Sequence, residues 1–427
     1  MVKNKVFKNA SWIIMCRVVQ SVCSMVVLML TARYLGPSNY GLINYASSVV
    51  AFVVPIMQLG FNNILVQELV QNPQKGGEIF GTSILMSLCS SVVCIIGVIS
   101  FVYIVNFGET DTIIVCALYS IILIFQAMEL IQYWFQAKYL SKYAAIVSLC
   151  AYVVVSIYKI FLLATGKSIY WFAVSNALDC MLISISLLII YKKIGGGKFK
   201  FSLNAASEMF SKSRYYIISG LMITIFAQTD KIMLKLMIDE AATGYYSAAI
   251  TCAGMTTFVF AAIIDSARPA IFEGQKNSTQ AFENSMSRLY CVIIYLSLAQ
   301  SILMTLFAKP IISILYGSGY APSIVILQMA VWYTTFSYMG SVRGIWILAM
   351  GQQRLLLVIN LIGATANVLL NAILIPKFQA VGAAIASVIT QFFTNVILGF
   401  IIKPIRENNK LMLRGLNINL ITKMLKK

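Results

Sequence analysis

Apolar residues occur in long blocks along the chain, and short polar or basic segments separate these blocks. Each block is close to the roughly 20 residues that a helix needs to cross a hydrocarbon core about 30 Å thick. Because such a core holds no water to satisfy backbone amides, blocks of this length predict α-helices. The strands of a membrane barrel would be shorter and would alternate in polarity. We predict about twelve spans, at residues 11–32, 42–66, 80–105, 112–134, 144–164, 169–191, 214–236, 245–267, 289–308, 323–349, 355–375 and 380–402.

The longest polar interruption divides these spans into two sets of six. It runs from Lys192 to Arg214 and contains Gly195-Gly196-Gly197, a run of glycines typical of a flexible connector. The two halves match faintly at an offset of 203 residues, where Gly41 falls on Gly244. Repeated halves are common in transporters, with the substrate path between them. The sequence therefore predicts an all-α integral membrane protein with halves at residues 1–200 and 201–402 and a basic tail at residues 403–427.

The basic residues are distributed unevenly between the two sides of the predicted membrane. Of the 32 Lys and Arg residues, 23 lie in segments on the side of the termini, five in the opposite loops and four within spans. Cytoplasmic loops carry the excess of Lys and Arg. We therefore predict that both termini and residues 192–214 are cytoplasmic and that residues 309–322 face outward. The net charge of +18 then lies against anionic lipid, and no nucleic-acid partner is expected.

The composition is typical of a membrane protein and excludes several kinds of catalytic site. Only 11% of the residues are charged, against about 25% in soluble domains. There is no histidine, which excludes zinc–histidine sites and Ser–His or Cys–His nucleophiles. The nine cysteines stand singly inside apolar blocks, as core-filling residues do, and no Walker pattern is present. We therefore expect no catalytic site, no cofactor and no metal centre.

Eight ionisable residues lie within the predicted spans. A charge at membrane depth costs about 2.5–3.5 kcal/mol on insertion scales, and such residues usually face an aqueous or protein-lined interior. Glu129 and Asp265 fall near the cytoplasmic ends of their spans, where interfacial placement explains them equally well. Lys231 has a stem long enough to reach the interface. The other five are Arg17, Lys159, Asp179, Asp230 and Arg343.

Each of these five charges has two interpretations. Arg17, Lys159 and Arg343 either neutralise acids inside the bundle or bind the phosphates of an anionic cargo, to which arginine offers bidentate contact. Asp179 either neutralises Lys159 on the adjacent span or binds a coupling ion. By its depth in the span Asp179 is the first coupling candidate, and Asp230 is the second. Desolvation favours proton binding by a buried carboxylate, and neutral oxygens around it would favour sodium.

Polar residues at helical spacing accompany some of these charges. Ser175 and Ser186 share the helix face of Asp179, and Asn367 and Asn371 share a face of the eleventh predicted span. Such stripes either line a polar cavity or make hydrogen bonds between helices of a packed bundle.

Three connecting segments carry motifs that resemble a known family. They are Thr31-Ala32-Arg33-Tyr34-Leu35-Gly36-Pro37-Ser38-Asn39-Tyr40-Gly41, then Thr229-Asp230-Lys231-Ile232-Met233-Leu234 with Gly244-Tyr245-Tyr246-Ser247-Ala248-Ala249, and Leu315-Tyr316-Gly317-Ser318-Gly319-Tyr320. Together with the number and orientation of the spans, they make essentially the whole chain resemble the Wzx-type polysaccharide flippases. These are O-antigen and capsule repeat-unit translocases of the multidrug/oligosaccharidyl-lipid/polysaccharide exporter superfamily.

The resemblance implies two six-helix lobes around a central cavity that opens alternately to either side. The implied cargo is an undecaprenyl-diphosphate-linked oligosaccharide, moved to the outer leaflet of a bacterial cytoplasmic membrane for O-antigen (lipopolysaccharide), capsule or exopolysaccharide synthesis. Membrane lipids and a polymerase and chain-length regulator of the same pathway are the implied partners. Arg17 matches a first-span arginine of the family, Lys159 and Arg343 are candidate cavity residues, and ion coupling would fall to Asp179 or Asp230.

Three other classes remain as alternatives. An ion-coupled drug antiporter of the same superfamily should favour an anionic cavity, whereas the spans here carry equal numbers of each charge. A membrane-embedded polymerase or glycosyltransferase would need a large outer loop or a carboxylate-rich cytoplasmic site. A structural scaffold would have little reason to keep charges within its spans.

Overall fold

The computed structural model describes residues 2–417, with the side chains of residues 2–19, 21–22 and 276–277 outside the described part. The chain divides into two compact units, Met1–Gln228 and Thr229–Lys427, and α9 runs from one into the other. Within the described range every regular element is helical, which agrees with the predicted fold class. The boundary at residue 200 between two transport lobes, and the separate tail from residue 403, stay predictions.

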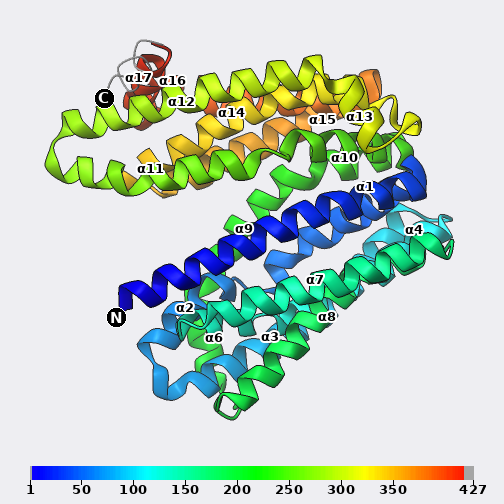
Figure 1. Ribbon diagram of the computed structural model, residues 1–427, viewed down its shortest axis with the longest axis vertical. Helices are drawn as coiled ribbons and strands as arrows, with labels where there is room; N and C mark the ends of the chain where they lie inside the picture. The colour runs from blue at the N-terminus through cyan, green and yellow to red at the C-terminus, as the bar shows by residue number, and fades with distance from the viewer. Residues whose placement is uncertain (1, 418–427) are drawn as a thin grey trace. The chain divides into compact units, whose positions relative to one another are not determined.

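The first unit contains α1 to α8 and the first part of α9; Figure 1 labels most of these helices. In it α1 packs against α7, and α8 packs against α4, α5 and α7. The core between α2, α3, α6 and α8 is built from aromatic and branched apolar side chains such as Phe80, Phe135 and Leu187. The helices are α1 (Val2–Met57), α2 (Phe61–Gln71), α3 (Gly76–Val105), α4 (Thr110–Ser120), α5 (Ile122–Met128), α6 (Ile131–Ala137), α7 (Ser141–Ala164), α8 (Ile169–Lys193) and α9 (Leu203–Met237).

The second unit is organised around α14, which packs between α12 and α15 (Figure 1). Its core includes Tyr290, Val342 and Ile347, all fully buried. After α9, its helices are α10 (Glu240–Gly254), α11 (Thr257–Asn277), α12 (Thr279–Leu306), α13 (Ala308–Leu315), α14 (Ser323–Ala349), α15 (Arg354–Phe392), one π-helical turn (Phe393–Ile397), α16 (Leu398–Ile401) and α17 (Arg406–Gly415).

Within the described residues, nine helical segments are long and apolar enough to cross a membrane. Two of them, Cys23–Gln71 and Arg354–Ile401, have 49 and 48 residues, about twice the length of one crossing. Each contains a break in helical geometry, at Gly36 (φ 71°) and at Gln379 (φ 52°). Both breaks fall between predicted spans, as the pattern of apolar blocks requires. The chain is therefore a multi-pass membrane protein, while the number twelve stays a prediction.

The segment between residues 192 and 214 differs from the flexible connector that its glycines predict. α9 already begins at Leu203, and the preceding residues pack on α3: the amide of Lys200 donates to the carbonyl of Gly77 at 3.2 Å. The hydroxyl of Tyr191 donates to the carbonyl of Gly197 at 2.8 Å, and a Cβ at Gly196 would lie 2.4 Å from the Tyr191 ring. These glycines thus permit close backbone packing.

This packing predicts a stability difference between two glycines of α3. A Cβ at Gly81 would lie 2.6 Å from the Lys200 carbonyl oxygen, whereas nothing lies within 4 Å of one at Gly97. Gly81→Ala should therefore destabilise the protein by about 1–3 kcal/mol through overpacking, while Gly97→Ala should be neutral or stabilising by about 0.5–1 kcal/mol. Thermal unfolding of both variants in detergent measures this, and equal midpoints would contradict the packed segment.

Candidate functional site

The buried carboxylate of Asp230 accepts hydrogen bonds from three neutral side chains of the second unit, and the neighbouring Lys231 interacts with it electrostatically. Asp230 lies on α9 and is 7% exposed. It accepts from the Tyr246 hydroxyl on α10, from the Ser387 hydroxyl on α15 at 2.6 Å and from the Asn371 amide on α15 at 2.6 Å. The Asn371 amide also donates to the Asn367 side-chain oxygen at 3.1 Å. Three helices therefore meet at one carboxylate through neutral groups.

These side chains form a cage around the Asp230 carboxylate, in which a bound cation can take the place of one hydrogen-bond donor. Hydrogen-bond donors that satisfy the carboxylate oxygens lower the cost of burying this polar group within the bundle. The side-chain oxygen of Asn371 is buried without a hydrogen-bond partner, and turning this amide would direct that oxygen at Asp230. The hydroxyl oxygens of Ser387 and Tyr246 contact the same carboxylate, and the Asn367 oxygen contacts the Asn371 amide beside it. Oxygen ligands of this kind suit a hard cation, and the carboxylate itself can bind a proton.

The first unit holds the other predicted acid and a lysine together. The Lys159 ammonium on α7 donates to the Asn176 side-chain oxygen on α8 at 3.1 Å, and the Asn176 amide donates to the Tyr119 hydroxyl at 3.3 Å. Asp179 lies on α8 close enough to interact electrostatically with Lys159. One Asp179 carboxylate oxygen is buried without a hydrogen-bond partner.

Two residues near Asp179 make contacts that the sequence did not indicate. Ser175 donates its hydroxyl to the Phe172 carbonyl within α8 at 2.6 Å, so this hydroxyl serves the helix backbone. Glu129, which interfacial placement would explain equally well, is half-buried and interacts as a like charge with Asp179. It lies where α5 ends, in a break that the apolar pattern of residues 112–134 does not reveal.

The structure describes the side chain of Arg343 but not that of Arg17, the other arginine predicted for the site. Arg17 lies on α1, but its side chain is outside the described residues. Arg343 lies on α14 in the second unit, is 4% exposed, and donates to the Thr394 carbonyl at 2.6 Å and to the Asn395 side-chain oxygen at 2.9 Å. Among the predicted site residues, the structure therefore places Lys159 with Asp179 in the first unit, and Asp230 and Arg343 separately in the second.

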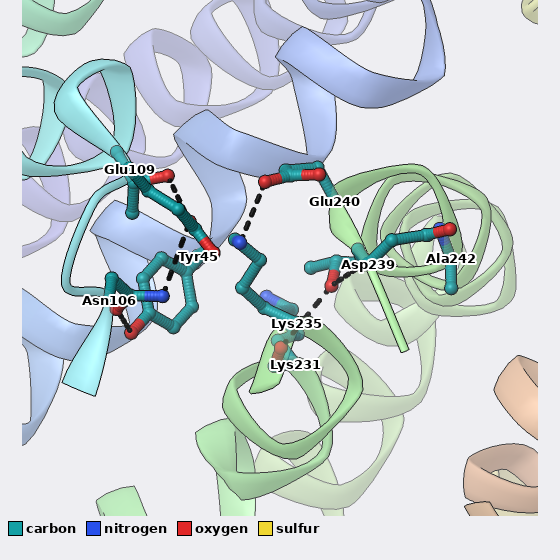
Figure 2. A network of polar contacts seen from close by, with 10 residues as sticks. Tyr45, Asn106, Glu109, Lys231, Lys235, Asp239, Glu240 and Ala242 are labelled. Carbon is teal, nitrogen blue, oxygen red and sulfur yellow. Dashed lines mark hydrogen bonds and ion pairs between the residues drawn. The ribbon is translucent and has the colours of Figure 1, made fainter. Parts of the chain in front are cut away.

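Sequence reasoning missed further polar groups, which Figure 2 displays. In the second unit, the buried Lys235 ammonium pairs with Glu240 at 2.7 Å, and the Asp239 carboxylate accepts from the Ala242 amide at 2.7 Å and caps α10. In the first unit, the Tyr45 hydroxyl donates to Asn106 at 2.8 Å. The signal for the α10 cap, an aspartate just before the helix, was present in the sequence.

The fold and these buried charges define a multi-pass, all-helical membrane protein that holds ionisable groups within its spans. The chain belongs to the polysaccharide biosynthesis protein family, whose model matches residues 6–275. This confirms at family level the resemblance found in the motifs. The capsular polysaccharide biosynthesis protein CapF of Staphylococcus aureus is 20% identical over 395 residues, which cover 90% of this chain and 96% of the relative.

Two solved structures share the fold. The lipid II flippase MurJ in an inward closed conformation superposes with a TM-score of 0.74 and 16% identity, over 97% of this chain and 92% of that chain. An inward-facing multidrug resistance MATE family transporter of the MOP superfamily gives a TM-score of 0.71 and 12% identity, over 92% of this chain and 96% of that chain. At these identities the likeness establishes the fold.

Proposed function

We propose that the protein flips an undecaprenyl-diphosphate-linked oligosaccharide repeat unit from the cytoplasmic to the outer leaflet by alternating access. The observation that carries this proposal is the family match together with a full-length fold shared with a lipid II flippase. O-antigen, capsule and exopolysaccharide synthesis are the pathways such a cargo serves, and the capsular relative favours the second. A polymerase and a chain-length regulator of that pathway are the proposed partners.

The proposed division of labour assigns anion recognition to basic side chains and coupling to buried acids. Arg17 and Lys159 are proposed to bind the diphosphate, since fixed cations offset the cost of taking phosphate oxygens out of water. Arg343 was predicted for the same role, but its contacts favour a different one. Asp230 is proposed as the main coupling acid because its oxygen-rich surroundings suit a proton or a sodium ion. Asp179 is the second candidate.

A drug antiporter of the same superfamily is the second candidate function, because the MATE transporter shares the fold. The two functions predict different phenotypes in cells that lack the protein. Loss of a flippase should accumulate lipid-linked glycan on the cytoplasmic leaflet and remove surface polysaccharide. Loss of an antiporter should leave the polysaccharide intact and raise sensitivity to cationic drugs. Quantifying both in one strain decides between them.

The proposed location is a bacterial cytoplasmic membrane with both termini inside. The positive-inside distribution of Lys and Arg supports it. Reporter fusions after Lys193 and at Gly415 should be active only as cytoplasmic reporters, and a fusion at Gly319 only as an outward one. An outward reporter that is active at residue 193 would contradict both the orientation and the predicted twelve spans.

A further inference from the structure

One turn of π-helix, Phe393–Ile397, interrupts the last membrane-spanning segment between α15 and α16. A π turn holds one extra residue and opens the hydrogen-bond ladder to outside donors, and such turns are frequent at functional sites. Two of its carbonyls accept side chains from other helices. The Thr394 carbonyl accepts from Arg343 on α14 at 2.6 Å, and the Val396 carbonyl accepts from the Asn409 amide on α17 at 2.8 Å. The π turn is thus a joint between α14 and α17.

Arg343 is fitted closely to this joint. Its second terminal nitrogen donates to the Asn395 side-chain oxygen at 2.9 Å, and the Asn395 amide donates to Gln391 at 2.6 Å. Gly340 lies one helical turn before Arg343, and a Cβ there would lie 2.3 Å from the same Asn395 oxygen. Both terminal nitrogens of the guanidinium are therefore directed at the π turn. This geometry gives the buried arginine two acceptors within the protein, while its Nε is buried without a hydrogen-bond partner.

The helix on the other side of the joint is docked on the second unit along its length. In α17, Leu411 and Met412 are buried, and Asn408 accepts from the Tyr290 hydroxyl of α12 at 2.9 Å. A Cβ at Gly399 of α16 would lie 2.2 Å from the Asn409 side-chain oxygen. The last span and α17 therefore fit together only when Gly399 faces Asn409.

We infer that Arg343 is a positioning residue that holds the π turn in the register required for docking α17. Loss of Arg343 would leave the buried Thr394 carbonyl and the Asn395 side-chain oxygen without their hydrogen-bond donor. The π turn would then relax to regular α-helix, because that removes the unsatisfied groups. Removing the extra residue rotates everything beyond it by about 100°, since an α-helix has 3.6 residues per turn. The Val396 carbonyl and Gly399 would then face away from Asn409. This inference does not depend on the nature of the cargo.

Limited trypsin digestion of the purified full-length protein tests the inference through cleavage after Lys410, which lies on α17. Cleavage there requires α17 to undock, because a protease acts on locally opened chain. A charged hydrogen bond contributes about 1.5–3 kcal/mol, so Arg343→Gln should speed the appearance of the cleaved peptide, followed by mass spectrometry, by roughly tenfold or more. Arg343→Lys, which keeps one donor, should be intermediate. The control Arg354→Gln, at the start of α15, should cleave at the parent rate.

A double-mutant cycle separates this role from a general loss of stability. Asn409→Ala should also speed cleavage, and adding it to Arg343→Gln should have little further effect, because both variants break the same joint. Parent-like cleavage in Arg343→Gln and Arg343→Lys would overturn the inference, and a transport defect in those variants would then assign Arg343 to the cargo. Fully additive effects of the two changes would also overturn it. If Arg343→Gln does not fold, the double-mutant cycle is made with Arg343→Lys and Asn409→Ala instead.

Discussion

Replacing Asp230 with Asn is expected to abolish the dependence of transport on an imposed ion gradient while cargo still binds. Asparagine keeps the size of the side chain and one acceptor oxygen for Tyr246 or Ser387, but it neither titrates nor offers the charge that a cation requires. The ratio of transport rates with and without the gradient should fall to about one. Reconstituted vesicles that hold a proton or a sodium gradient, tested separately, measure this ratio and identify the ion.

The matched control is Asp265→Asn on α11. Asp265 is 64% exposed and pairs with Arg268 at 3.0 Å, so it is an acid of the same unit outside the Asp230 cage. Its replacement should leave gradient dependence unchanged. Asp179→Asn tests the second candidate in the same assay. Gradient dependence that persists in both Asp230→Asn and Asp179→Asn would show that these acids are structural.

Replacing Lys159 with Ala is expected to reduce transport by roughly 10- to 100-fold, which corresponds to loss of a charged hydrogen bond worth about 1.5–3 kcal/mol. The two interpretations of Lys159 separate in the double variant with Asp179→Asn. If Lys159 serves the phosphates, the double variant stays as inactive as Lys159→Ala. If Lys159 only neutralises Asp179, removing both charges restores transport, because no unpaired buried charge remains.

Asn176→Ala provides the corresponding control on α8. The Asn176 side chain is a neutral acceptor for the Lys159 ammonium at 3.1 Å, so its loss should reorient the lysine without changing the charge of the site. We expect a smaller defect than that of Lys159→Ala, because the lysine and its charge stay in the site and the ammonium can find another acceptor. A defect as large as that of Lys159→Ala would assign the effect to packing of α7 on α8.

The spans and their breaks could be predicted from the sequence because apolar length is the main requirement of a membrane-spanning segment. Gly36 with Pro37, and the segment around Gln379, fall where the apolar blocks end. The breaks inside residues 112–134 could not be predicted, because α4, α5 and α6 divide within one continuous apolar block. The packing of Gly195 to Gly197 depends on α3, which lies far away in sequence.

Single residues of the candidate site could be predicted from the sequence, but the residues that each of them contacts could not. The spacing of Asn367 and Asn371 placed both amides on one helix face, and Asp230 stood out as a charge at depth. Their meeting through a 2.6 Å hydrogen bond depends on how α9 packs against α15. The contacts of Arg343 depend on a π turn, for which local sequence carries no reliable signal because tertiary packing stabilises the inserted residue.

Movement of a lipid-linked oligosaccharide by the purified protein tests the proposed function most directly. Undecaprenyl-diphosphate-linked oligosaccharide is loaded into the inner leaflet of liposomes, and a glycosidase outside reports on molecules that reach the outer leaflet. The proposed function predicts protein-dependent exposure that an ion gradient accelerates, and that loses this acceleration in Asp230→Asn. Exposure no faster than in protein-free liposomes, with gradient-driven uptake of a cationic drug by the same preparation, would contradict the flippase and establish the antiporter.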